Sequence, residues 1–75
     1  MLMLQDGLTA LHISTTMSRL NHVQFLLDRG AAVDSTDKDM RTALFIALFV
    51  GCREIAELLI LRGADVVTNR IVRLL

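Results

Sequence analysis

The chain is poor in cysteine and in aromatic residues. It has 75 residues with one cysteine, Cys52, and its three aromatic residues are all phenylalanine. A single cysteine allows no internal disulfide, which suits a reducing, intracellular compartment such as the cytoplasm. The scarcity of aromatics in a chain that is 53% hydrophobic favours helices packed on helices over a sandwich of sheets. We therefore expect one small helical domain.

The chain also lacks net charge and a hydrophobic run of membrane length. Eight basic and eight acidic residues cancel, so we expect no general attraction to nucleic acid or to an acidic membrane surface. The longest uninterrupted apolar run, residues 43–52, has ten residues, whereas a membrane helix needs about 20. The opening MLML has neither the basic flank nor the length of a secretory signal. No membrane partner is expected.

What the chain does contain is an internal repeat with a period of 33 residues. Shifting the sequence by that distance places Thr9-Ala10-Leu11 on Thr42-Ala43-Leu44, and Arg29-Gly30-Ala31 on Arg62-Gly63-Ala64. A fixed period of this size is typical of stacked repeat proteins, in which each unit buries its apolar face against the next one.

Each copy holds two apolar segments of helical length. In the second copy they are residues 43–50 and 53–61, separated by Gly51-Cys52 and closed by Gly63. The spacing in the later segment predicts a buried face and a charged face. The buried face would carry Ile55, Leu58, Leu59 and Leu61, and the charged face Arg53, Glu54 and Glu57.

In the first copy, Thr9 is the expected N-cap of a helix running to about Met17. A second helix is expected over residues 20–28 and closed by Gly30. Its inward residues would be Val23, Leu26 and Leu27, with Phe25 beside them.

These residues also carry a family resemblance. The segment Asp6 to Asp34, DGLTALHISTTMSRLNHVQFLLDRGAAVD, resembles an ankyrin repeat, and Thr42 to Val66, TALFIALFVGCREIAELLILRGADV, resembles a second one. The resemblance implies an all-α repeat fold, an ankyrin-like solenoid fragment of antiparallel helix pairs with β-hairpin or turn tips. It divides a single domain, residues 1–75, into repeat 1 at about 4–34, repeat 2 at about 37–67 and a non-consensus tail at 68–75. It also implies a noncatalytic module that binds other proteins, as part of a longer array.

Five residues are informative when the chain is compared with the family pattern. His12 occupies the family's histidine, which implies a hydrogen bond within and between the tips, and Phe45 replaces that histidine in repeat 2. Ser18 and Met40 stand where the family has glycine, so a left-handed backbone at either one would carry strain. His22 stands where the family prefers isoleucine. Since a buried unpaired imidazole is costly, we expect its ring to be partly exposed or hydrogen-bonded.

No pattern in the chain calls for catalysis, a cofactor or a metal. The sole lysine, Lys38, lies in no phosphate-binding glycine loop, and His12, His22 and Cys52 are too few and too scattered for zinc. A nucleophilic pair of Cys52 with either histidine is formally possible, but packing is the expected role of the thiol. The acidic pairs are expected to be solvated: Asp37 with Asp39 on a loop, and Glu54 with Glu57 on a helix face.

The resemblance places the partner-binding surface at positions that vary within the family, on the tips and the inner helices. Phe49 and Val50 are the candidate apolar anchors, although Phe49 could instead fold onto Met17 or the tail. Arg29 falls on the same surface. The full predicted set is Gln5, Asp6, Leu8, Thr16, Met17, Lys38, Asp39, Arg41, Phe49, Val50 and Arg62.

Three other functions compete with this one. The apolar ends, MLML and IVRLL, predict either that isolated chains self-associate or that the natural protein continues beyond one terminus. End-to-end stacking could itself be the function, as in an assembly or scaffold element. A second alternative is a redox sensor or thiol enzyme that uses Cys52. The third is peripheral membrane attachment through residues 71–75.

Overall fold

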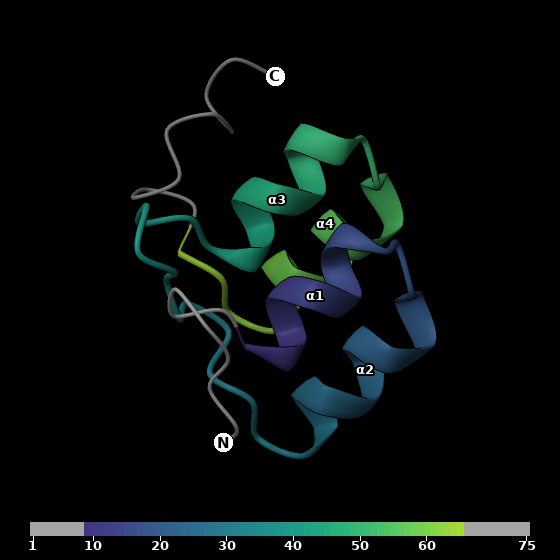
Figure 1. Ribbon diagram of the computed structural model, residues 1–75. Helices are drawn as coiled ribbons and strands as arrows, with labels where there is room; N and C mark the ends of the chain where they lie inside the picture. The colour runs from purple at the N-terminus through teal and green to yellow at the C-terminus, as the bar shows by residue number, and fades with distance from the viewer. Residues whose placement is uncertain (1–8, 66–75) are drawn as a thin grey trace.

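The computed structural model describes residues 9–65, which form two stacked helix pairs. Repeat 1 consists of α1 (Ala10–Thr16) and α2 (Leu20–Asp28), and repeat 2 consists of α3 (Ala43–Val50) and α4 (Arg53–Leu61). α1 packs against α3 and α2 against α4, so the two pairs lie side by side (Figure 1). The predicted all-α repeat fold is confirmed.

A threonine starts the first helix of each repeat. The backbone N–H of His12 donates to Oγ1 of Thr9 at 3.3 Å, and the N–H of Phe45 donates to Oγ1 of Thr42 at 3.1 Å. Both threonines have extended backbone and so stand just outside the helix, as an N-cap requires. The predicted cap at Thr9 is confirmed.

All four helices end with the same pair of hydrogen bonds. In α1 these run from the N–H of Ser18 to the carbonyl of Thr15 and from the N–H of Arg19 to the carbonyl of Ser14. The equivalent pairs close the other three helices around Gly30, Gly51 and Gly63. This ending needs a left-handed residue, and Ser18 adopts a φ of 56° where the three glycines have 80° to 96°. Ser18 thus has the left-handed backbone that, by the sequence analysis, would carry strain in a residue with a Cβ.

One hydrophobic core joins the two repeats. Its fully buried members come from every helix: Leu11 of α1, Val23 of α2, Leu44 of α3, and Ile55 and Leu59 of α4, each at most 2% exposed. Burying such side chains contributes about 1.5–3 kcal/mol each to stability. The apolar surface shared between the pairs therefore holds the molecule together.

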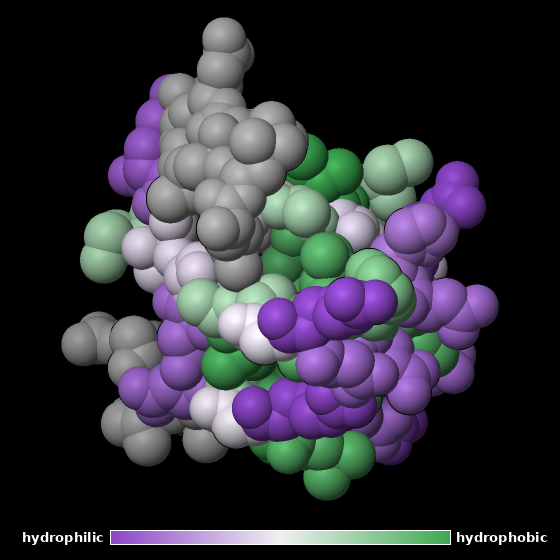
Figure 2. All heavy atoms as spheres, turned by 90° about the horizontal axis from the view of Figure 1, so that it is seen from below, coloured by the Kyte–Doolittle hydropathy of each residue, from purple (hydrophilic) through white to green (hydrophobic). Residues whose placement is uncertain are grey.

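Two predicted core residues are exposed instead. Phe25, expected beside the core, is 56% exposed, and Leu61, expected on the buried face of α4, is 82% exposed. Each lies two residues after a fully buried one, Val23 or Leu59. Two residues turn a helix by about 200°, so both side chains point away from the core. They belong to the outer helices, and hydrophilic and hydrophobic side chains share the surface seen from the side of α2 (Figure 2).

A tight turn forms the tip that precedes α3. The N–H of Met40 donates to the carbonyl of Asp37 at 3.0 Å, and the N–H of Asp37 donates to the carbonyl of Arg41 at 3.1 Å. Met40 has a φ of 62°, so this is a three-residue loop with a left-handed bulge residue. The glycine-type turn is kept despite the side chain, at a cost of about 1–2 kcal/mol. The tip is a turn, since residues 9–65 contain no β-strand.

No helix within these residues combines the length and the apolar character needed to cross a membrane.

Candidate partner-binding groove

A groove lies between the first helices of the two repeats and the tip of repeat 2. Its volume is about 370 Å³. Thr16 of α1 and Arg41 of the tip line it, and the remaining lining residues come from α3: Phe45, Ile46, Phe49 and Val50. Four predicted binding residues, Thr16, Arg41, Phe49 and Val50, are therefore brought together here.

Aromatic side chains form the apolar part of the groove. Phe45 and Phe49 are one helical turn apart, with ring centres 6.2 Å apart and planes tilted by 34°, which is within the range of favourable aromatic pairs. Phe45 is half-buried, whereas Phe49 is 76% exposed. The pair thus has a fixed inner ring and an outer ring that faces solvent. Val50, the residue after Phe49, is also exposed, as is Met17 at the end of α1.

Asp37 holds in place Arg41, one of the residues that line the groove. One carboxylate oxygen of Asp37 accepts the backbone N–H groups of Asp39 and Arg41, both at 2.9 Å. The other accepts Nε of Arg41 at 2.8 Å. Asp37 is buried, so the expectation that it is solvated is wrong for this residue. A short side chain can bond the backbone two residues ahead, and this turn uses that capacity.

The environment of Asp37 acts on its pKa in two opposing ways. Burial raises the pKa, but the hydrogen bonds from Arg41 and Asp39 and the charge of Arg41 lower it more, and the net result lies below the ordinary value. Each of these bonds favours the charged carboxylate. Asp37 is therefore ionised, and both of its carboxylate oxygens accept hydrogen bonds within the tip.

His12 ties the tip of repeat 2 to α1 of repeat 1. The backbone N–H of Thr9 donates to Nδ1 of His12 at 3.2 Å, and Nε2 lies 2.9 Å from the carbonyl oxygen of Arg41. Because Nδ1 accepts, the neutral ring carries its proton on Nε2 and donates it to Arg41. The ring is 1% exposed. This is the hydrogen bond within and between tips that the resemblance implied for His12, while His22 is exposed as expected.

The other predicted residues lie around the groove, apart from it, or outside the described part of the chain. Lys38 and Asp39 are exposed on the tip, and Nη2 of Arg41 lies 3.3 Å from Asp39. Arg62 lies elsewhere: its Nη2 is 2.7 Å from a carboxylate oxygen of Asp28, which links the two outer helices. Arg29 lies over the ring of Phe25, 4.8 Å from its centre. Gln5, Asp6 and Leu8 fall outside the described residues.

Phe45 and Ile46 line the groove without having been predicted to do so. The useful signal for Phe45 was its spacing, because a residue four positions before Phe49 shares its helix face. Within residues 9–65, no cluster of three or more His, Cys, Asp or Glu side chains is placed to hold a metal ion. Cys52 is half-buried just before α4.

Two stacked helix pairs with a turn at the tip define a helical-repeat protein, and sequence comparison identifies which kind. The sequence profile described as "Ankyrin repeats (3 copies)" matches residues 1–70. The chain belongs to the ankyrin-repeat family. Repeats of this family generally mediate protein–protein interaction and are typically noncatalytic.

Two curated relatives show the same likeness over most of the chain. The probable E3 ubiquitin-protein ligase XBOS31 of Oryza sativa subsp. japonica is 38% identical over 63 residues, which cover 84% of this chain. The B-cell lymphoma 3 protein homolog of Mus musculus is 39% identical over 62 residues, which cover 81%. The match spans 14% of the length of each relative.

Proposed function

We propose that the chain is a noncatalytic binding module whose groove and tip hold a protein partner. The observation that carries this proposal is the exposure of Phe49, an aromatic side chain 76% open to solvent on the wall of a groove. Leaving such a ring in water forgoes the stabilisation that burial would give. A partner that covers it recovers that free energy, and aromatic side chains are frequent anchors of interfaces.

The charges around the groove indicate what the partner presents. The guanidinium of Arg41 is shared between Asp37 and Asp39, so its positive charge is largely compensated within the tip. A strongly acidic partner would gain little there, since it would compete with two carboxylates already in place. We infer that the partner offers an apolar side chain to Phe49 and Val50, with polar contacts confined to the tip.

The test compares two exposed apolar side chains on different surfaces. Peptides selected from a displayed random library for binding to the chain are measured against Phe49→Ser, Val50→Ser and Leu61→Ser. Leu61 is the matched control because it is 82% exposed on the outer helix α4. We expect the two groove variants to lose at least about tenfold in affinity, or about 1.4 kcal/mol, with Leu61→Ser unchanged. Equal losses in all three variants, or none at Phe49, would overturn the proposal.

We also propose that this role is carried out inside the cell, in the cytoplasm, without thiol chemistry. The support is the presence of a single cysteine, which suits a reducing compartment. Peptide binding by Cys52→Ala equal to that of the unchanged chain is expected. A loss of binding that follows oxidation of Cys52 would instead favour the redox alternative.

A further inference from the structure

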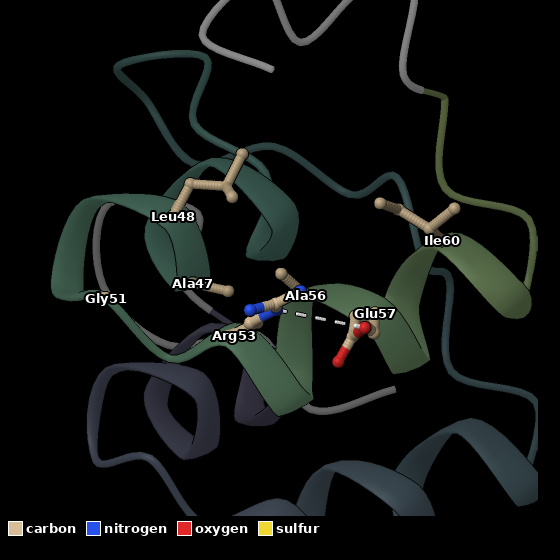
Figure 3. A pocket seen from close by; sticks show the side chains of 7 residues that line it. All are labelled: Ala47, Leu48, Gly51, Arg53, Ala56, Glu57 and Ile60. Carbon is tan, nitrogen blue, oxygen red and sulfur yellow. Dashed lines mark ion pairs between the residues drawn. The ribbon is translucent and has the colours of Figure 1, made fainter. Parts of the chain in front are cut away.

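Among residues 9–65, the side of repeat 2 that faces away from repeat 1 is lined only by α3, α4 and the turn at Gly51. A hollow of about 570 Å³ lies between α3 and α4 on this side (Figure 3). Leu48 of α3 and Ile60 of α4 flank it, and the small side chains of Ala47 and Ala56 lie between them. We call this surface the end face. It comprises Ala47, Leu48, Arg53, Ala56, Glu57 and Ile60, the last four at the spacing of one helix stripe.

The same surface of repeat 1 is covered. Residues 33 positions earlier include Thr15 and Val23, both fully buried, and Leu20 and Leu27, both packed against the core. Repeat 2 is what covers them, since α1 packs on α3 and α2 on α4. The end face thus corresponds to the surface that repeat 1 buries against the helix pair of repeat 2. Of its apolar members, Ile60 is 42% exposed and Leu48 is half-buried, whereas Ala47 and Ala56 are buried. Exposed apolar side chains beside a hollow favour association.

The charges on the end face make it complementary to itself. Arg53 and Glu57 project from α4, 89% and 62% exposed, with Nε of the arginine 4.0 Å from a carboxylate oxygen of the glutamate. A two-fold axis that passes between these two positions would place each arginine opposite the glutamate of another copy, twice over. A surface with one cation and one anion side by side matches itself in this way, as a two-fold dimer requires.

The opposite end of the array is a poorer match for the end face. Within the molecule, the surface of repeat 2 that meets repeat 1 carries Ile55, which is fully buried. The equivalent residue of repeat 1 is His22, which is exposed. Head-to-tail stacking of two copies would place an imidazole where the internal contact has a buried isoleucine, and burying an unpaired polar ring is unfavourable.

We propose that the end face binds the end face of a second copy of this chain, forming a two-fold symmetric dimer in which Arg53 of each copy faces Glu57 of the other. Leu48 and Ile60 supply the apolar contact beside the two charged pairs. The surface lies apart from the groove that contains Phe49, so the dimer stands independently of the proposed partner binding.

Charge reversal tests the symmetry directly by sedimentation velocity across the micromolar range. The unchanged chain is expected to dimerise, and Arg53→Glu or Glu57→Arg alone should weaken dimerisation by at least about tenfold, because each places like charges opposite one another twice. An equimolar mixture of the two single variants should dimerise again, and so should the double variant. Only a face that meets itself predicts both recoveries.

Controls separate this result from misfolding and from partner binding. Glu54→Arg makes an equal charge change on the same helix, outside the end face, and should leave the dimer intact, as should Phe49→Ser. Circular dichroism establishes that every variant is folded. A folded chain that stays monomeric throughout the range would overturn the proposal. So would dimers that neither the mixture nor the double variant restores, which would indicate head-to-tail stacking.

Discussion

The two repeats have the same order of helices but differ at the positions where one covers the other. α2 and α4 are both nine residues long and begin 33 residues apart. Yet Ile55 of α4 is fully buried and its equivalent in α2, His22, is exposed. Likewise Thr15 of α1 is fully buried, whereas its equivalent Leu48 of α3 is only half-buried. In a stacked array, position within the stack decides burial as much as residue type does.

Thr15 shows how a polar residue is accommodated on the covered side. Its hydroxyl donates to the carbonyl of Leu11 at 2.8 Å within the same helix. A buried hydroxyl that is satisfied by its own preceding turn costs little. Repeat 1 can therefore place threonine at the position where repeat 2 has leucine.

The largest expected effect comes from truncating the buried member of the His22 and Ile55 pair. Ile55→Ala should lower the free energy of unfolding by about 2–5 kcal/mol, because it removes transfer free energy and leaves a cavity between the repeats. His22→Ala should change it by less than about 0.5 kcal/mol, since an exposed side chain is removed. Urea unfolding followed by circular dichroism measures both.

A milder substitution allows the same comparison if the Ile55→Ala variant does not fold. Ile55→Val removes one methyl group and should cost about 0.5–1.5 kcal/mol. Similar losses for His22→Ala and Ile55→Val would show that the repeats do not share a core as described.

The second effect concerns the tip that joins the repeats. Asp37→Asn keeps one acceptor for the backbone of Asp39 and Arg41 but removes the charge and the acceptor for Nε of Arg41. We expect a loss of about 1.5–3 kcal/mol, typical of a hydrogen bond to a charged group. Asp39→Asn is the matched control: its carboxylate is exposed and lies 3.3 Å from the same arginine, so the loss should be below about 1 kcal/mol.

The pH dependence gives the same test a second readout. The pKa of Asp37 is lowered in the folded chain, so the unfolded chain, with a pKa of about 3.9, takes up the proton first. The stabilisation is complete above about pH 4–5 and is lost as the pH falls through the folded value. The free energy of unfolding, measured from neutral pH down to this acid range, should therefore change less with pH for Asp37→Asn than for Asp39→Asn. Equal curves would contradict the role given to Asp37.

Much of the fold was readable from the sequence because it depends on local rules. The threonine caps, the glycine helix ends and the 33-residue period each specify structure within a few residues. The errors concern the directions in which side chains point from the helices. Phe25 and Leu61 were assigned by hydrophobicity although the turn of the helix points them outward.

The site was less readable for a similar reason. Asp37 was read as solvated because its partners, the backbone of its own turn and Arg41, become apparent only once the tip has closed. Phe45 was read as a substitute for a histidine, and its place in the groove wall depends on the packing of α3 against α1. Four of the predicted binding residues share one groove, whereas Arg62 links the outer helices through Asp28.

The smallest expected effect comes from exchanging the residues that end the first helix of each repeat. Ser18 and Gly51 adopt left-handed backbone with φ of 56° and 80°, and a Cβ added at Gly51 would meet no atom within 4 Å. Only backbone preference therefore separates serine from glycine at these turns. Glycine removes about 1–2 kcal/mol of strain from the folded chain. Part of this gain in stability is offset, because glycine also gives the unfolded chain more conformational freedom.

Ser18→Gly should accordingly raise the free energy of unfolding by about 0.5–1 kcal/mol, and Gly51→Ser should lower it by a similar amount. The double exchange should leave stability nearly unchanged, because it moves the same serine from one turn to its equivalent. Thermal unfolding of the three variants measures this. A double exchange that destabilises the chain would show that the two turns, although alike in hydrogen bonding, differ in what surrounds them, and that the repeats are less equivalent than their backbones indicate.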